Sequence, residues 1–581
     1  MSAELTYRLA DSTLVEPLVN NWVAWSYLIS PAAASLHLLH YQIKTMKDYL
    51  RDPELHFQAC HNAELLGGPF INIPTQRAHE VKELLAQTER QMGANLEFAR
   101  AIIQFQNLLV AEARGQSLDA FYDRLPHALR GYVELLYDYY SRPLARFIEG
   151  LLYESDYYKP ELNSLRISQL VRDDDRKFFL STPRLPEPDQ IDWKIPFADP
   201  LVDEIFKLDS TPQPLARIRE IFGPLASDDQ LLLRCLTPEP AVPARRWSGP
   251  YVRLRYFGHA CVLVDWNGVS VLTDPFIAVK PLEGGLERLS FQDLPPKIDY
   301  VLITHNHSDH FVIETLLRLR HRIECLVVPK SYGILYGDLS LKLMAQKLGF
   351  KQVVELETME SIALPDGEII SIPFFGEHGD LAHGKTGYVV RAGVERIMFG
   401  ADSDCLDRRV YENVRRSLGP IQTVFLGTEC LGAPLTWSYG PLFPVQPERN
   451  HVQSRRQHGC DAKAALDILE TIGARRFYNY GMGLEPWLEQ ILALGLSDNS
   501  PQIKESNCLL AKARDRGLLA ERLFGCRDIY LEQQAVPGSS ALVAGIQHND
   551  EFLLPEKVDE TYSGTRVSPP DLADAEDQFA F

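Results

Sequence analysis

Three histidines and an aspartate lie within a short stretch of the chain, at His305, His307, Asp309 and His310. They follow residues 298–304, a nearly continuous apolar run that is typical of a buried strand. Side chains at this spacing cannot all face one way from a regular strand or helix, but a loop that leaves a strand can turn them inward together. Imidazole and carboxylate groups are ligands suited to zinc, iron or manganese. The segment therefore predicts a site for two adjacent cations.

Short apolar segments on both sides of this motif predict a mixed α/β domain over residues 251–531. Residues 251–257, 261–265 and 269–273 have strand patterns, and Asn267-Gly268 is a favoured two-residue hairpin turn. Helices are expected at 311–319 and 340–347. Further strands are expected at 368–374, 387–391, 396–399 and 423–426. The strand ends are where ligands for the two cations could gather.

The first 180 residues predict a mainly helical domain for dimerisation or partner docking. Apolar residues recur at helical spacing in 78–113 and again in 128–153. The aromatic side chains of the second stretch, which include Tyr139 and Tyr140, are expected in a core or at a domain interface. No histidine before residue 245 has a metal-ligand spacing. We therefore expect no catalysis in this region.

Two segments differ in composition from these domains. Residues 181–250 hold 12 of the 38 prolines, and proline disfavours both helix interiors and sheet ladders. This stretch is expected to be a linker that wraps around the domains. Residues 532–581 are expected to be an acidic flexible tail, because 550–581 carry nine acidic residues against Lys557 and Arg566.

The composition excludes several classes of protein. A formal net charge of -19 disfavours sequence-independent nucleic-acid binding. No apolar run approaches the length of a membrane helix, and the first residues lack the pattern of a secretory signal. The nine cysteines are dispersed and contain no C-x-x-C pair, which disfavours a disulfide framework or a thiolate metal site. We expect a cytoplasmic protein with no nucleic-acid or membrane partner.

The motif has a wider context that resembles the metallo-β-lactamase fold. Phe257-Gly258-His259-Ala260 and Thr273-Asp274-Pro275 precede His-x-His-x-Asp-His, as in that family. The resemblance covers residues 250–500 and implies an αββα sandwich with two metals at one edge of its paired sheets. It does not fix the reaction, because one fold hosts many activities.

Further ligands are implied by this resemblance. Asp402, after Phe399-Gly400-Ala401, fits the bridging aspartate. Between the loop and that aspartate the chain offers both Glu377 and His378. For the last ligand the strand end at 479–483 has no histidine, and His458 or Glu429 could serve instead.

The chain is more narrowly similar to the di-iron β-hydroxylases of the chloramphenicol-pathway type. Gly376-Glu377-His378 offers the extra carboxylate, 428–434 precedes Trp437-Ser-Tyr-Gly, and a long helical region precedes the metal domain. The resemblance implies β-hydroxylation of an amino acid held as a thioester on a nonribosomal peptide synthetase carrier domain, in antibiotic biosynthesis. Two iron ions, as an oxo- or hydroxo-bridged pair, would use O2 as co-substrate. No flavin or nicotinamide motif is present, so an external electron donor or reductase is implied.

On this resemblance each candidate residue has an expected role. His305, His307 and Glu377 would hold one iron, Asp309 and His310 the other, and Asp402 would bridge them. His458 or Glu429 would complete the second site. A ligand set rich in carboxylates favours iron. In a zinc hydrolase the same carboxylates would raise the pKa of the zinc-bound water, which that reaction needs to be low.

Other residues near the motif are expected to support it. They are expected to orient the metal ligands or to line the substrate pocket: His259, Asp274, His378, Glu429, Trp437 and Tyr439. A tethered substrate implies a tunnel for the phosphopantetheine arm. Dimerisation through the helical domain is a further hypothesis. The alternative function is a zinc- or manganese-dependent hydrolase of the same fold, with two zinc ions, acting on a phosphodiester, lactone or amide.

Overall fold

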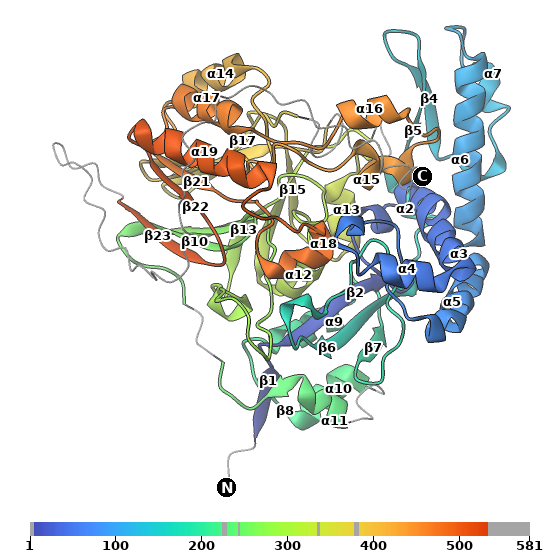
Figure 1. The fold of residues 1–581 in the computed structure, drawn as a ribbon, viewed down its shortest axis with the longest axis horizontal. Coiled ribbons are helices and arrows are strands. Elements are labelled where there is room, and N and C mark those ends of the chain that lie inside the picture. The colour runs from blue at the N-terminus through green and yellow to red at the C-terminus, as the bar shows by residue number, and fades with distance from the viewer. Residues whose placement is uncertain (1–4, 224–228, 242–244, 334–336, 377–382, 533–581) are drawn as a thin grey trace. The chain divides into compact units, whose positions relative to one another are not determined.

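Two seven-stranded sheets organise residues 251–532 (Figure 1). The computed structural model describes residues 5–223, 229–241, 245–333, 337–376 and 383–532. The first sheet has the order β15-β14-β13-β12-β11-β10-β23. Its strands are β10 (Tyr251–Gly258), β11 (Cys261–Trp266), β12 (Val269–Thr273), β13 (Ile298–Leu302), β14 (Ile323–Pro329), β15 (Val353–Leu356) and β23 (Arg527–Glu532). The strands from β12 to β15 run parallel, and the other pairs are antiparallel.

The second sheet repeats this division into an antiparallel half and a parallel half. Its order is β16-β17-β18-β19-β20-β21-β22, and the strands from β19 to β22 run parallel. Its strands are β16 (Ser361–Leu364), β17 (Gly367–Ile372), β18 (Gly387–Ala392), β19 (Glu395–Phe399), β20 (Thr423–Leu426), β21 (Arg476–Asn479) and β22 (Leu519–Arg522).

Apolar side chains from both sheets meet in one buried layer. Val264 and Leu302 of the first sheet belong to the same cluster as Val390 and Phe425 of the second. Helices α14 (Arg408–Leu418), α17 (Ala462–Ile472) and α19 (Pro501–Asp515) cover the outer face of the second sheet. Helices α12 (Ile313–Leu319) and α13 (Leu341–Lys347) pack on the first sheet. The expected αββα sandwich is confirmed.

Local sequence signals placed most of these elements. The turn at Asn267-Gly268 joins β11 to β12, and both residues have the positive φ angles that a type I′ turn requires (45° and 76°). Helix α13 begins after Ser340, whose hydroxyl accepts a hydrogen bond from Leu343 N. Every strand and helix expected in 251–426 is present, with ends shifted by a few residues.

The N-terminal region combines helices with three small sheets. Its helices include α1 (Ser26–Ile29), α2 (Pro31–His37), α3 (Ile43–Arg51), α4 (Pro53–Ala59), α5 (Ala78–Gln91) and α6 (Gly93–Glu112). Strands β2 (Thr13–Val19), β3 (Trp22–Val23), β6 (Asn163–Gln169) and β7 (Ile191–Lys194) form a four-stranded sheet. Helical residues predominate over strand residues in this region, as expected.

The helix expected over 128–153 is wrong. That stretch forms a hairpin of β4 (Val133–Tyr137) and β5 (Pro143–Phe147). Asp138 closes the turn, because its carboxylate accepts from the backbone N–H groups of Tyr140 and Arg142. Tyr139 and Tyr140 at this turn are exposed, contrary to the expected burial.

The proline-rich segment contributes elements to the N-terminal sheets. Strand β7 pairs with β6, while β8 (Gln213–Pro214) and β9 (Leu236–Thr237) flank β1 (Thr6–Leu9). Helices α9 (Pro200–Lys207), α10 (Leu215–Phe222) and α11 (Asp229–Arg234) lie between them. The segment is therefore more than the wrapping linker that its prolines indicated. The acidic tail lies outside the described residues.

One continuous hydrophobic core joins the N-terminal region to the first sheet of the sandwich. Buried ion pairs cross the same boundary: Asp209 binds Arg318, and Asp173 binds Arg288. Among the described residues, no helix is both long enough and apolar enough to cross a membrane.

Candidate metal centre

The His-x-His-x-Asp-His segment forms a tight loop between β13 and α12. His310 N and Phe311 N both donate to His307 O, which curls the loop back on itself. His305 and His310 are fully buried, while His307 and Asp309 are 7% and 8% exposed. The four side chains are thus brought together at the carboxyl end of a central strand.

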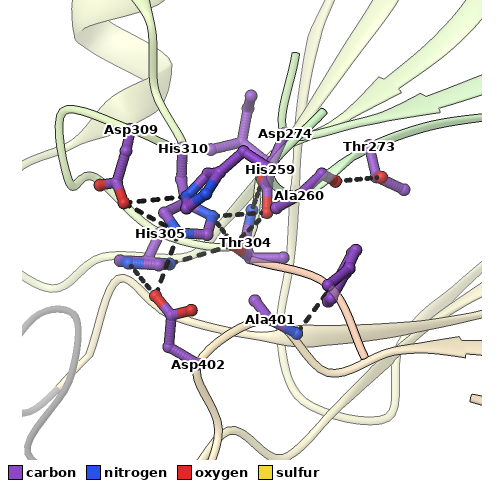
Figure 2. A network of polar contacts seen from close by, with 12 residues as sticks. His259, Ala260, Thr273, Asp274, Thr304, His305, Asp309, His310, Ala401 and Asp402 are labelled. Carbon is purple, nitrogen blue, oxygen red and sulfur yellow. Dashed lines mark hydrogen bonds and ion pairs between the residues drawn. The ribbon is translucent and has the colours of Figure 1, made fainter. Parts of the chain in front are cut away.

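One cluster joins this loop to the second sheet (Figure 2). Asp402 follows β19, and its Oδ2 lies 3.4 Å from His305 Nε2 and 3.0 Å from His310 Nε2. These ligand atoms lie close enough together to hold one cation. The sequence predicted that Asp402 and the loop would meet, and the structure brings them together.

A second cluster shares His310 and adds a residue from another strand end. His259 follows β10, and its Nε2 lies 3.0 Å from Asp309 Oδ2. Asp309 Oδ2 is also 3.6 Å from His310 Nε2. His259, Asp309 and His310 form the second group of ligand atoms that could hold a metal ion. Sequence reasoning placed His259 only beside the site, although Phe257-Gly258-His259 at a strand end was the available signal.

Asp274 supports the loop through contacts with Thr304 and His310. Its carboxylate accepts from Thr304 N (2.7 Å) and Thr304 Oγ1 (2.6 Å). It also lies 2.9 Å from His310 Nδ1. A ligand histidine commonly gives its second ring nitrogen to a carboxylate, which fixes the orientation of the ring. Asp274 therefore holds the His310 ring at Nδ1, which leaves Nε2 on the side of both clusters.

Backbone strain is concentrated at the strand ends that carry these residues. His259, Asp274 and Ala401 have φ angles of 50°, 31° and 47°, in the left-handed region that disfavours non-glycine residues. Such conformations persist only where the surroundings impose them, and they are common at functional sites. Gly459 allows a further close approach, because a Cβ there would lie 2.9 Å from Asp402 O.

The donor set and the charge of the site fit two cations. Three buried carboxylates, Asp274, Asp309 and Asp402, surround His310. Burial lowers the pKa of His310, but these carboxylates outweigh burial and hold the pKa well above its usual value. A site that is so strongly negative requires compensating positive charge. Histidine and carboxylate donors are suited to iron, manganese or zinc.

The remaining candidates occupy different positions around the clusters. Tyr439 Oη lies 2.9 Å from His307 Nε2, and Trp437 Nε1 donates to Gly67 O. His458 lies outside both clusters, with its Nδ1 3.5 Å from Asp404 Oδ2. The carboxylate of Glu429 is also in neither cluster. Glu377 and His378 lie outside the described residues.

A hollow of about 160 Å³ opens beside the centre, at the ends of strands from both sheets. Its described lining includes Lys330, Lys385 and Phe374. The Phe374 ring centroid is 5.5 Å from that of His305, and Thr386 N donates to Thr304 O. Two residues of the lining, Phe374 and Thr386, thus contact the start of the ligand loop.

Comparison with known proteins yields matches over both regions. Residues 8–240 match the diiron non-heme beta-hydroxylase N-terminal domain, and residues 270–480 match the beta-lactamase superfamily domain. The chain is 35% identical over 538 residues to the 4-amino-L-phenylalanyl-[CmlP-peptidyl-carrier-protein] 3-hydroxylase of Streptomyces venezuelae, covering 91% of this chain and 100% of that protein. A partial match is a UPF0173 protein of Pyrococcus abyssi, 31% identical over 22% of this chain and 50% of the relative.

Solved structures agree with this result. The crystal structure of CmlA, a diiron beta-hydroxylase from Streptomyces venezuelae, has a TM-score of 0.85 and 33% identity, and covers 91% of this chain and 100% of that chain. A structure of a CmlA beta-hydroxylase variant with a glutamate-to-aspartate substitution has a TM-score of 0.83. The family resemblance expected from the sequence is confirmed.

Proposed function

This chain belongs to the diiron non-heme β-hydroxylase family, and from that membership we propose that it hydroxylates the β-carbon of an amino acid tethered as a thioester to a nonribosomal peptide synthetase carrier domain. The observation that carries the proposal is the match, over 91% of this chain and 100% of the relative, to a protein named as a hydroxylase of a carrier-bound aminoacyl group. The family membership favours this oxidation over the hydrolase alternative.

We propose the iron ligands from the two clusters together with the family resemblance of the sequence, which adds His307 and Glu377. His305, His307 and Glu377 would bind one iron, with Asp402 between the metals. Asp309 and His310 would bind the other, and His259 would take the place considered for His458 or Glu429. The support for His259 is its Nε2, 3.0 Å from Asp309 Oδ2 in a group that could hold a metal.

An iron pair held by these residues would supply, together with O2, the oxidising power for hydroxylation. The overall reaction takes one O2, two electrons and two protons, and it gives the β-hydroxyl group and one water. The electrons come from an external donor, for which we propose a separate reductase. The chain's own residues position the metals: Asp274 orients His310, and Tyr439 contacts His307.

The hollow beside Phe374 is our proposed approach for the tethered substrate. Lys330 and Lys385 line it together with Glu357, and the two ammonium groups suit the phosphodiester of a phosphopantetheine arm. Phe374 would separate the approaching arm from His305. We also propose a cytoplasmic location, since all nine cysteines are unpaired and such thiols are stable in a reducing compartment.

The test is a single-turnover reaction with iron-loaded, chemically reduced enzyme and carrier domains loaded with different amino acids. Exposure to ¹⁸O2 should add one labelled oxygen at the β-carbon of the preferred aminoacyl group, measured by mass spectrometry after release. The same amino acids free in solution should react far more slowly. Release of the amino acid without oxygen incorporation would instead support the hydrolase alternative.

A further inference from the structure

The ring of His307 is held by a hydrogen bond between its Nε2 atom and Tyr439. Tyr439 Oη lies 2.9 Å from His307 Nε2, and both side chains are buried. His305 has the opposite arrangement, because its Nδ1 lies 3.0 Å from Thr304 Oγ1 and its Nε2 points toward Asp402. Because the phenol holds Nε2, a metal would be bound through the other ring nitrogen of His307, Nδ1.

Tyr439 is itself positioned by the N-terminal region. It ends α15 (Leu435–Tyr439), and its ring centroid lies 6.3 Å from that of Tyr27 at a tilt of 50°. Tyr27 belongs to α1 and is fully buried. Both rings also border Gly337, where a Cβ would come within 3.4 Å of Tyr27 Oη and 3.6 Å of the Tyr439 ring. The phenol that holds His307 therefore rests on a side chain from more than 400 residues earlier in the chain.

Helix α1 also holds the peptide at Asn306, between His305 and His307. Ser26 Oγ donates to Asn306 O at 2.8 Å, and Asn306 Nδ2 donates to Gly337 O at 3.0 Å. Asn306 is fully buried between His305 and His307. Helix α1 thus contacts the backbone of the ligand loop directly, through Ser26. It also supports the His307 ring indirectly, because Tyr27 packs against Tyr439, which holds that ring.

Aromatic packing anchors α1 within the N-terminal region. The Trp25 ring lies 4.6 Å from Tyr27, 5.6 Å from His37 and 5.9 Å from Phe179. A rigid support of this kind is what allows outer residues to set the orientation of a metal ligand. The N-terminal region is therefore built into the metal centre in addition to packing against the sandwich.

We propose that the N-terminal region is a structural part of the iron site, with Ser26 and Tyr439 as positioning residues that fix the His305-Asn306-His307 segment. This inference rests on the proposed function only for the identity of the metal. Removing the Tyr439 hydroxyl takes one restraint from the His307 ring, and removing the Ser26 hydroxyl takes one restraint from the Asn306 peptide. Both changes weaken the hold on the metal while leaving every ligand in place.

The test uses the full-length protein and compares Tyr439→Phe with Tyr49→Phe. Tyr49 is a matched control, because it is a buried tyrosine whose hydroxyl donates to Ile73 O, remote from the metal centre. The Tyr439→Phe protein is expected to lose iron to a chelator about ten-fold faster than the wild type, and to show a changed Mössbauer spectrum in the diferric state. Tyr49→Phe should keep the wild-type release rate and spectrum, even if its melting temperature falls.

Ser26→Ala has an equally close control in Ser35→Ala. Ser35 is fully buried and its Oγ donates to Pro31 O at 2.7 Å, within the same region. We expect Ser26→Ala to speed iron release several-fold and Ser35→Ala to leave it unchanged, while Ser26→Thr, which keeps the hydroxyl, restores slow release. Equal release rates and spectra for each variant and its control would overturn the proposal. The assay needs no substrate and can be repeated with zinc, so its failure is separate from a failure of the hydroxylase assignment.

Discussion

The Nε2 atom of His259 lies 3.0 Å from Oδ2 of Asp309, although fifty positions of sequence separate the two residues. The contact joins the end of β10 to the loop after β13 and completes a group of possible ligands with His310. It depends on a strained backbone at His259, whose φ is 50°. This relationship places a third strand end at the metal centre, beside those that carry His310 and Asp402.

Substitution of His259 therefore tests the composition of the second iron site. We expect His259→Ala to bind about one iron per chain where the wild type binds about two, because a lost ligand weakens one site and spares the other. His458→Ala should retain both irons, since His458 contacts Asp404 and lies outside the clusters. Elemental analysis of each purified variant is the measurement.

His56→Ala is the control for loss of a buried imidazole. His56 is 6% exposed and accepts a hydrogen bond from Ile71 N, away from the metal centre. It should bind as much iron as the wild type. Full iron content in His259→Ala together with depletion in His458→Ala would return the last ligand to His458.

Asp274 should influence iron affinity without binding iron. Asp274→Asn replaces one acceptor oxygen by an amide donor facing Thr304 Oγ1 and His310 Nδ1, so the orientation of His310 is lost. We expect iron affinity to fall about ten-fold or more. The free energy of unfolding of the metal-free protein should fall by about 1–3 kcal/mol. Chelator competition and urea unfolding measure the two effects.

Asp265→Asn separates these two effects. Asp265 is a buried carboxylate of β11 that binds Arg253 at 2.7 Å, remote from the clusters. It should show a loss of stability with unchanged iron affinity. Parallel losses of iron affinity in both variants would mean that Asp274 acts only through general stability.

Local signals in the sequence predicted the strands and helices of the sandwich, and the family resemblance implied their arrangement. Strand patterns such as 269–273 and the Asn267-Gly268 turn determine elements within a few residues, and His-x-His-x-Asp-His lies on one loop. The last ligand of the second metal, His259 or His458, could not be chosen from such local signals. It depends on which strand ends meet in three dimensions, and spacing along the chain carries no information on that contact.

The errors in the N-terminal region have physical causes as well. The apolar residues of 133–137 are compatible with helical spacing, but the turn at Asp138 and Pro143 at the start of β5 favour a hairpin. The prolines of 181–250 occupy places that tolerate them. Pro200 is at the first turn of α9, and Pro214 lies in the short outer strand β8.

A buried ion network predicts acid sensitivity of the N-terminal region. Burial raises the pKa of Glu16, but Arg184 and then Arg176 outweigh that effect and lower it from 4.5 to about 2. Because the folded pKa lies below the unfolded value, the stabilisation is complete above pH 4.5 and is lost as pH falls toward 2. The shift corresponds to about 3 kcal/mol. Urea unfolding of the wild type and Glu16→Gln should show a stability difference that is largest at pH 7 and narrows below pH 4. A difference that stays constant with pH would contradict this role for Glu16.

Charge at the hollow beside Phe374 should affect recognition of the tethered substrate. Lys330 is partly exposed and lies 3.8 Å from Glu357. Lys330→Glu reverses its charge and should repel the phosphodiester of the arm. We expect a several-fold higher KM for the loaded carrier with little change in kcat, and a smaller effect at high salt.

Lys342→Glu is the matched control for charge reversal. Lys342 has a similarly exposed side chain and lies 3.3 Å from Glu355, but it does not line the hollow. If both variants raise KM equally, the effect comes from the net charge of the protein, and the hollow has no special role. If only Lys330→Glu raises KM, the arm passes this point, because a charge acting through screened solvent falls off within about 8–10 Å.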